Sequence, residues 1–219
     1  MTHLPASPAL RYRLGTGRQG LLGLALSPDG QWLAWGEKRG TIGLLPIAPR
    51  EWHPIDGGMN LSRWVRTIAR SRDGRLRAAG DEEGHIWLWD PERKEKAPIH
   101  WKAHSGPVHA IAFHPEGTCL ASAGEDGWIR LWGLPDGRLL RALKSGPAAI
   151  RGLAFAPEGD RLAAGGHDHQ IRIWKLSTGR LWKRLEGHVD RVMAVAFAPD
   201  GRFLASGDRS GALHPWRMP

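Results

Sequence analysis

The sequence has a single cysteine, Cys119, which excludes an intrachain disulfide and a zinc site built from several thiolates. It also lacks any run of about 18 apolar residues, which excludes a membrane-spanning helix. Residues 1–8 contain no basic segment followed by an apolar stretch, so no secretory signal is visible. We therefore expect a cytoplasmic protein that makes no use of a membrane.

Glycine, tryptophan and positive charge are abundant instead. The 219 residues include 29 glycines, 12 tryptophans and 31 basic residues against 22 acidic ones, for a net charge of +9. Of the basic residues, 24 are arginine and seven are lysine. Hydrophobic residues make up 41% of the chain, which is ordinary for a globular domain and excludes a disordered one. The positive charge favours anionic partners.

A short turn recurs five times along the chain. Its second residue returns at intervals of 44, 43, 42 and 42 residues, at Pro28, Arg72, Pro115, Pro157 and Pro199. Seventeen residues after each of these positions stands Leu45, Trp89, Trp132, Trp174 or Trp216. Two landmarks that keep the same phase through five units indicate a repeat protein.

Each unit is predicted to form four β-strands. An apolar run rich in small residues precedes each turn, at 21–26, 65–70, 108–113, 150–155 and 192–197. Short continuous apolar runs are typical of strands buried on both faces. In the third unit, the later strands are expected at 118–122, 128–132 and 138–143, and the fourth unit has an equivalent last strand at 180–185. Because such sheets have two apolar faces, sister sheets packed around an axis must cover them.

The units resemble WD repeats of the β-propeller superfamily. The third unit carries the four residues that match the family's buried, hydrogen-bonded tetrad, namely His104, Ser122, Asp126 and Trp132. The resemblance implies that the aspartate and the serine hold the histidine, which in turn meets the tryptophan. It covers almost the whole chain.

The other units match the tetrad only in part. In the fifth unit, Ser210 takes the place of the aspartate, although His188 is retained. The fourth unit keeps Asp168 but lacks the histidine and the serine, and the second offers only Glu83 and Trp89. The first unit has none of the four residues.

We predict one all-β domain over 1–219, a β-propeller of five four-stranded antiparallel blades. The repeat units are expected at about 15–58, 59–101, 102–143, 144–185 and 186–219. Segment 9–14 is expected to supply the fourth strand of the last blade and so to close the ring, which removes exposed sheet edges. The alternative is an open clamp whose gap is filled by a partner chain or by a second copy.

Catalytic chemistry is not expected. The five predicted innermost strands contain no Asp or Glu, so no pair of carboxylates faces the axis as a glycosidase requires. A surface metal site at His167 and His169, with His188 and Asp208 on corresponding loops, is one interpretation of the histidines. A polar corner capped by Asp168 is the favoured one. We predict no catalytic, metal-binding or cofactor-binding residues.

The second unit is unusually rich in arginine. Its innermost strand and turn carry the partner-binding candidates Arg63, Trp64, Arg66, Arg70, Arg72, Arg75 and Arg77. Arg70 stands where other units have Leu or Phe, and a guanidinium at a core position needs a carboxylate, an anion or an exposed edge. Either this blade is frayed and its arginines reach solvent, or its edge docks an acidic protein or a nucleic acid.

Loops at one rim of the propeller form the second candidate surface. The partner-binding candidates there are Arg18, Arg39, His167, His169, Arg191 and Arg209. We predict a non-catalytic protein–protein interaction scaffold, or a subunit of a larger assembly, with an acidic protein partner. A nucleic-acid-binding propeller is the alternative. The chain is expected to be a monomeric ring or a subunit of a hetero-complex, and a homo-oligomer if the ring is open.

Overall fold

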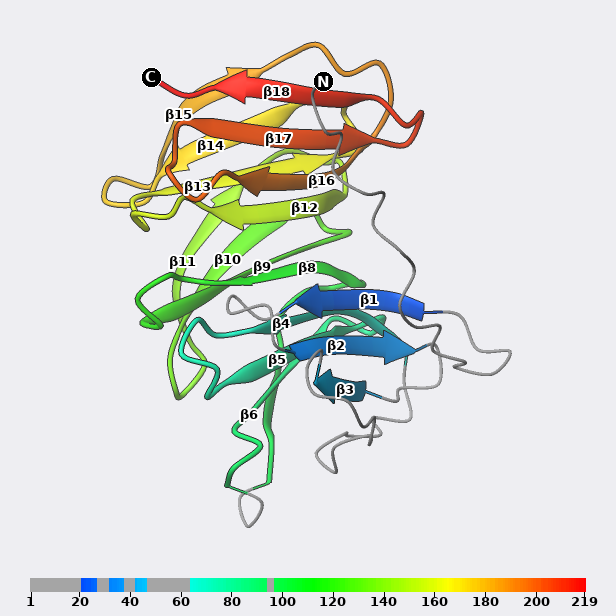
Figure 1. Ribbon diagram of the computed structural model, residues 1–219, viewed down its shortest axis with the longest axis vertical. Helices are drawn as coiled ribbons and strands as arrows, with labels where there is room; N and C mark the ends of the chain where they lie inside the picture. The colour runs from blue at the N-terminus through cyan, green and yellow to red at the C-terminus, as the bar shows by residue number, and fades with distance from the viewer. Residues whose placement is uncertain (1–20, 27–31, 38–41, 47–63, 94–96) are drawn as a thin grey trace, which may run out of the picture.

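The computed structural model describes residues 21–26, 32–37, 42–46, 64–93 and 97–219, the first three segments by their backbone alone. These residues form 18 β-strands and no helix, so the described part of the chain contains no helix able to span a bilayer. The strands make five separate sheets that follow one another in sequence order (Figure 1). The prediction of an all-β fold built from antiparallel blades is confirmed.

Each sheet is a meander of consecutive strands. Blade one contains β1 (Leu21–Leu26), β2 (Trp32–Glu37) and β3 (Ile42–Pro46). Blade two contains β4 (Val65–Arg70), β5 (Arg77–Asp81), β6 (His85–Trp89) and β7 (Ile99–Lys102). Blade three contains β8 (Val108–Phe113), β9 (Cys119–Gly124), β10 (Trp128–Gly133) and β11 (Arg138–Lys144).

The last two blades repeat the pattern. Blade four contains β12 (Ile150–Phe155), β13 (Arg161–Gly166), β14 (Ile171–Lys175) and β15 (Arg180–Leu185). Blade five contains β16 (Val192–Phe197), β17 (Phe203–Asp208) and β18 (Leu213–Arg217). The first strands of the five blades coincide with the apolar runs predicted before each turn. The turn glycines of blades two to five have φ of 77°, 71°, 77° and 69°, which explains why glycine recurs there, at Gly74, Gly117, Gly159 and Gly201.

The first strand of every blade is irregular at the same place. Its register with the second strand shifts after the first residue, and in the four blades with described side chains the residue passed over is Arg66, His109, Arg151 or Met193. A β-bulge redirects a side chain and is common at the rim of a sheet. The bulge therefore places one unpaired residue of each blade near the start of the first strand. This end of the blade is the rim that also carries the corner between the second and third strands.

Neighbouring blades share apolar layers. Between blades three and four, one buried cluster joins Ala121, Ala123, Ile129 and Leu131 to Leu162, Ala164 and Trp174. Equivalent clusters lie between blades two and three and between blades four and five. The sheets therefore bury one another's faces, as the two-faced apolar patterns required.

The described blades form an arc. The first strands pack in the order β1, β4, β8, β12 and β16, whereas β1 and β16, both described, do not pack against each other in the same way. Figure 1 shows blades three and four between blade five and blade one. The segment 9–14, expected to close the ring, lies outside the described residues.

Candidate functional site

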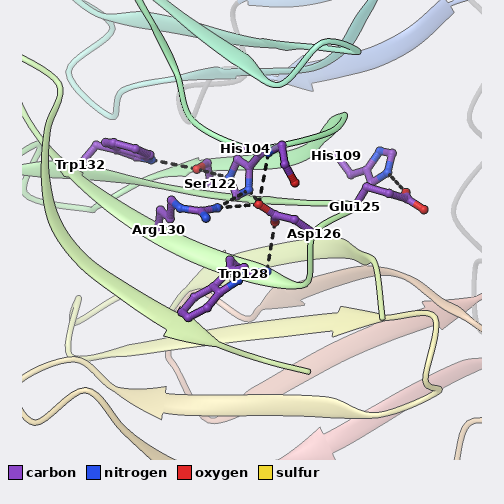
Figure 2. A network of polar contacts seen from close by, with 9 residues as sticks. His104, His109, Ser122, Glu125, Asp126, Trp128, Arg130 and Trp132 are labelled. Atoms are coloured by element: carbon purple, nitrogen blue, oxygen red, sulfur yellow. Dashed lines mark hydrogen bonds and ion pairs between the residues drawn. The ribbon is translucent and has the colours of Figure 1, made fainter. Parts of the chain in front are cut away.

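The four tetrad residues of blade three lie in one hydrogen-bonded network (Figure 2). Nδ1 of His104 is 2.8 Å from Oδ1 of Asp126, and Nε2 is 2.8 Å from Oγ of Ser122. Nε1 of Trp132 donates to the same Ser122 oxygen across 2.9 Å. The tryptophan therefore meets the serine, rather than the histidine as the resemblance implied.

Asp126 joins this network to the corner between β9 and β10. Its Oδ2 lies 2.8 Å from Nη1 of Arg130, and its Oδ1 accepts from the backbone nitrogen of Trp128 at 3.2 Å. Burial opposes ionisation of the carboxyl, but hydrogen bonds from His104 and Arg130 outweigh it and hold the pKa of Asp126 well below its usual range. The aspartate is thus a fixed negative charge that organises the corner.

Blade five has a complete network, although its sequence departs from the pattern. Nδ1 of His188 lies 2.7 Å from Oδ2 of Asp208, and Nε2 lies 2.6 Å from Oγ of Ser206. Trp216 donates to that serine oxygen across 2.7 Å. Asp208, the last residue of β17, supplies the carboxylate, so the assignment of that place to Ser210 was wrong. Ser210 instead donates to Oδ1 of Asp208.

Blade two uses the same displaced position. Asp81 ends β5 and is fully buried, and its Oδ2 accepts from Nε1 of Trp87 at 3.1 Å. Its Oδ1 accepts from the backbone nitrogens of Glu83 and His85 at 3.0 and 2.8 Å. The acid that organises this corner is therefore Asp81, whereas the sequence had pointed to Glu83. In blade four, the corner residue Asp168 is paired with Arg172 at 2.6 Å.

The bulge residues converge on a second polar network. Nε of Arg151 donates to Nε2 of His167 across 2.9 Å, and Nη1 of Arg151 lies 3.3 Å from Nδ1 of His109. Nε2 of His109 is in turn 2.7 Å from Oε2 of Glu125, a contact also drawn in Figure 2. Blades three and four are thereby joined at the rim, through Glu125, His109, Arg151 and His167.

The positive charges of further arginines also act on this network. Burial lowers the pKa of Arg151, and Arg66 and Arg191 lower it further. Burial also lowers the pKa of His167, again helped by Arg151 and Arg191. We use the term rim cluster for the set Arg66, His109, Glu125, Arg151, His167 and Arg191. It brings together side chains from blades two to four and from the loop before β16.

The rim cluster carries a net positive charge on its arginines, while its two imidazoles are neutral. Burial lowers the pKa of His109, and the positive charges of Arg151 and Arg66 lower it further. The hydrogen bond to Glu125 raises this pKa, but the net change is downward. The hydrogen bond from His109 lowers the pKa of Glu125. At pH 7 the guanidiniums and one carboxylate are therefore charged while both rings are not, which leaves a net positive surface suited to an anionic group.

The sequence identified part of this cluster and missed two of its members. Arg66, His167 and Arg191 were candidates, and Arg209 is an exposed neighbour whose charge also lowers the pKa of His167. His109 and Arg151 were not singled out. Their signal was the repeat phase, because they stand 43 and 85 residues after Arg66, at the same place in their units.

The other candidates lie elsewhere. His169 is an exposed corner residue with φ of 65°. Arg63, Arg18 and Arg39 lie outside the described residues. Trp64 is 40% exposed, and the guanidinium of Arg66 lies 5.4 Å from the centre of its ring.

The arginines of the second unit lie at both ends of blade two rather than on one edge. Arg66 is at the start of β4, whereas Arg70 is at its end and donates from Nε to the carbonyl of Gly74 at 3.2 Å. Arg72 and Arg75 are exposed in the turn that follows. Arg77 begins β5, and burial together with Arg70 lowers its pKa to about 10 despite nearby Asp90 and Glu92.

Reactive groups outside these networks are few in the described part of the chain. No group of three or more His, Cys, Asp and Glu side chains there is placed to hold a metal ion. His188 and Asp208, the alternative metal ligands, are instead buried partners of each other. Cys119 is buried, and burial raises the pKa of its thiol, which disfavours the reactive thiolate.

Comparison with known proteins places the chain among repeat proteins. The family model "WD domain, G-beta repeat" matches residues 96–133, 137–175 and 179–214. WD repeat-containing protein SL1-17 of Schistosoma mansoni is 30% identical over 53% of this chain and 38% of its own length. The Periodic tryptophan protein 2 homolog of Dictyostelium discoideum is 32% identical over 61% of this chain and 14% of its own.

A third relative matches a shorter stretch. The human Serine-threonine kinase receptor-associated protein is 39% identical over 25% of this chain and 15% of its own length. The matches to these three relatives thus span well under half the length of each. The family model covers just over half of the chain, and this chain belongs to the WD-repeat family.

Proposed function

We propose that this chain is a non-catalytic protein-interaction module and that the rim cluster binds an acidic segment of its protein partner. The observation that carries the proposal is the contact of Arg151 with both His109 and His167. It gathers residues of two blades around a guanidinium whose charged neighbours are two arginines, Arg66 and Arg191, and one carboxylate, Glu125. WD-repeat relatives support an interaction role, and one of them bears a name that associates it with a receptor kinase.

A carboxylate-bearing peptide suits this site for two reasons. Arginine donates paired hydrogen bonds to carboxylates in a fixed planar geometry. Arg151 is also held in place by hydrogen bonds to two histidines and by partial burial, which reduces the entropy lost on binding. Trp64, exposed beside Arg66, adds an aromatic surface of the kind enriched in binding hot spots.

Nucleic acid is the second candidate. The net charge of +9 and the excess of arginine favour it. The described arginines of blade two are divided between its two ends, however, so they do not form one continuous basic surface along which an extended backbone could lie. A compact acidic segment fits the rim cluster better than an extended polyanion does.

The test is binding of a labelled aspartate-rich peptide, measured by fluorescence anisotropy. Arg191→Ala removes an exposed charge of the rim cluster and is expected to weaken binding about tenfold, the effect of losing one charged hydrogen bond. Arg75→Ala removes an equal charge at the opposite end of a blade and is the matched control. Equal losses in both variants would indicate non-specific attraction and contradict the proposal.

The same assay separates the nucleic-acid alternative. A single-stranded oligonucleotide is titrated at several salt concentrations beside the peptide. Binding that is tighter than that of the peptide and falls steeply with salt supports nucleic acid. Binding of the peptide alone supports the interaction module.

A further inference from the structure

The outward face of blade five exposes residues whose counterparts are buried in the other blades. Leu213 is 80% exposed, while Ile129 and Ile171, at the same place in blades three and four, are both 0% exposed. Ala205 is likewise exposed, although its counterparts Ala121 and Ala163 are fully buried. The difference therefore lies in what covers the sheet and not in the chemistry of its residues.

Strand alternation shows that these residues form one continuous face. On β17, Leu204 and Ser206 point toward blade four, so Phe203 and Ala205 point away from it. On β18, Trp216 donates to Ser206 and shares the covered face, so Leu213 lies on the other. The outward face, which we define as Phe203, Ala205, Leu213 and Pro215, is apolar and exposed.

The contacts between blades two and three, three and four, and four and five all use the same pair of faces. The face of one blade that carries Ala121 and Ile129, or their counterparts, packs on the face of the next blade that carries Leu162 and Trp174, or theirs. The outward face of blade five is of the first kind, the one that carries Ala121 and Ile129 in blade three. It therefore requires as its cover a face of the second kind, the one that carries Leu162 and Trp174 in blade four. Exposed apolar patches of this kind mark interaction sites.

By sequence and register, blade one has the positions that form the second kind of face in the other blades. Leu33 pairs with Leu26 in β1–β2, as Leu204 pairs with Phe197 in β16–β17, so the two leucines hold equivalent register positions. The close packing that joins β1 to β4 and β12 to β16 is not found between β1 and β16, so blade one of the same chain does not cover blade five in the way that other neighbouring blades cover each other. The same register positions of blade one on another molecule therefore offer the matching cover.

We propose that the outward face of blade five binds a second copy of this chain, through blade one of that copy. The contact repeats the packing already used between blades within the chain, with apolar residues at the same register positions, Leu33 at that of Leu204 and Leu45 at that of Trp216. Because the two surfaces differ, the interface is head-to-tail, and it closes as a ring or extends to higher oligomers. This proposal is independent of the rim cluster.

The test is the oligomeric state of the full chain, measured by light scattering coupled to size-exclusion chromatography over about a hundredfold range of concentration. The wild type is expected to form dimers or larger assemblies that dissociate on dilution. Leu213→Glu is expected to give a monomer whose melting temperature equals that of the diluted, dissociated wild type, because the side chain packs little in the isolated chain. Val189→Glu, 79% exposed in the loop before β16, is the matched control and is expected to assemble as the wild type does.

Thiol labelling distinguishes the other ways of covering this face. Leu213→Cys is expected to react slowly in the assembly and quickly after dilution, while Val189→Cys reacts quickly in both states. If the wild type is monomeric and the Leu213→Cys variant still reacts slowly, another segment of the same chain covers the face. A monomer with fast labelling would mean that the face is free. Either result, or assembly that survives Leu213→Glu, overturns the proposal.

Discussion

Arg151 and His167 are joined by a hydrogen bond of 2.9 Å from the guanidinium Nε to the imidazole Nε2. An imidazole nitrogen accepts a hydrogen bond only when it carries no proton, so this contact requires the neutral ring. Burial and the charges of Arg151 and Arg191 maintain that state by lowering the pKa of His167. Acidification therefore adds positive charge to the rim cluster.

Binding of an acidic peptide is expected to strengthen as the pH falls from about 7.5 to about 5.5. A bound carboxylate favours protonation of His109 and His167, so binding takes up protons, while aspartates of ordinary pKa near 3.9 stay ionised. The dissociation constant measured by anisotropy is the readout. A variant with both His109→Gln and His167→Gln should lose this dependence, and a dissociation constant of the wild type that is independent of pH would contradict the assignment.

Asp126 is expected to contribute strongly to the stability of blade three. Asp126→Ala removes the carboxylate that pairs with both the buried Nδ1 of His104 and the guanidinium of Arg130, and the free energy of unfolding is expected to fall by about 1–3 kcal/mol. Urea denaturation followed by tryptophan fluorescence measures it. Asp136→Ala, at an exposed turn of the same blade, is the control and should have little effect.

Blade five offers a test of which residue completes its network. Asp208→Ala is expected to lower the melting temperature about as much as Asp126→Ala, because Asp208 faces His188. Ser210→Ala removes only a hydrogen bond to that carboxylate and is expected to lower it less. The reverse order in thermal unfolding would restore Ser210 to the role that the sequence pattern first gave it.

Acid is expected to destabilise the fold through the same two carboxyls. The pKa values of Asp126 and Asp208 are held below their usual range in the folded chain, so the unfolded chain binds more protons once the pH falls below about 4. Stability present above that pH is lost as the pH falls through the folded-state values. Denaturation curves at a series of pH values measure the slope, which should be shallower in Asp126→Asn. An unchanged slope would mean that the acid sensitivity arises elsewhere.

The fold followed from the sequence because its signals are periodic. The apolar runs before the turns predicted the bounds of β4, β8, β12 and β16, and the spacing of the tryptophans placed the third strands. The carboxylates of blades two and five did not follow, because Asp81 and Asp208 lie at the ends of strands, displaced from the position of Asp126. A pattern tied to one position in the unit does not detect a carboxylate that reaches the same corner from another.

The rim cluster was predicted only in part for a related reason. A bulge is a backbone feature without a reliable residue signature, so nothing in the sequence marked His109 or Arg151 as redirected side chains. Arg66 was predicted as a partner-binding residue only because its unit is rich in arginine. The repeat phase links the three residues once the register of the first strands is known.

The β-bulge shared by the first strands places a variable side chain on a framework that repeats from blade to blade. Residues 66, 109, 151 and 193 are Arg, His, Arg and Met, three residue types at one repeated position, while the layers between the blades remain apolar. Under the proposed function, a change at any of them alters the surface that meets the partner and leaves the apolar layers between the blades unchanged. The binding surface can thus be altered one blade at a time, by exchange of a single side chain.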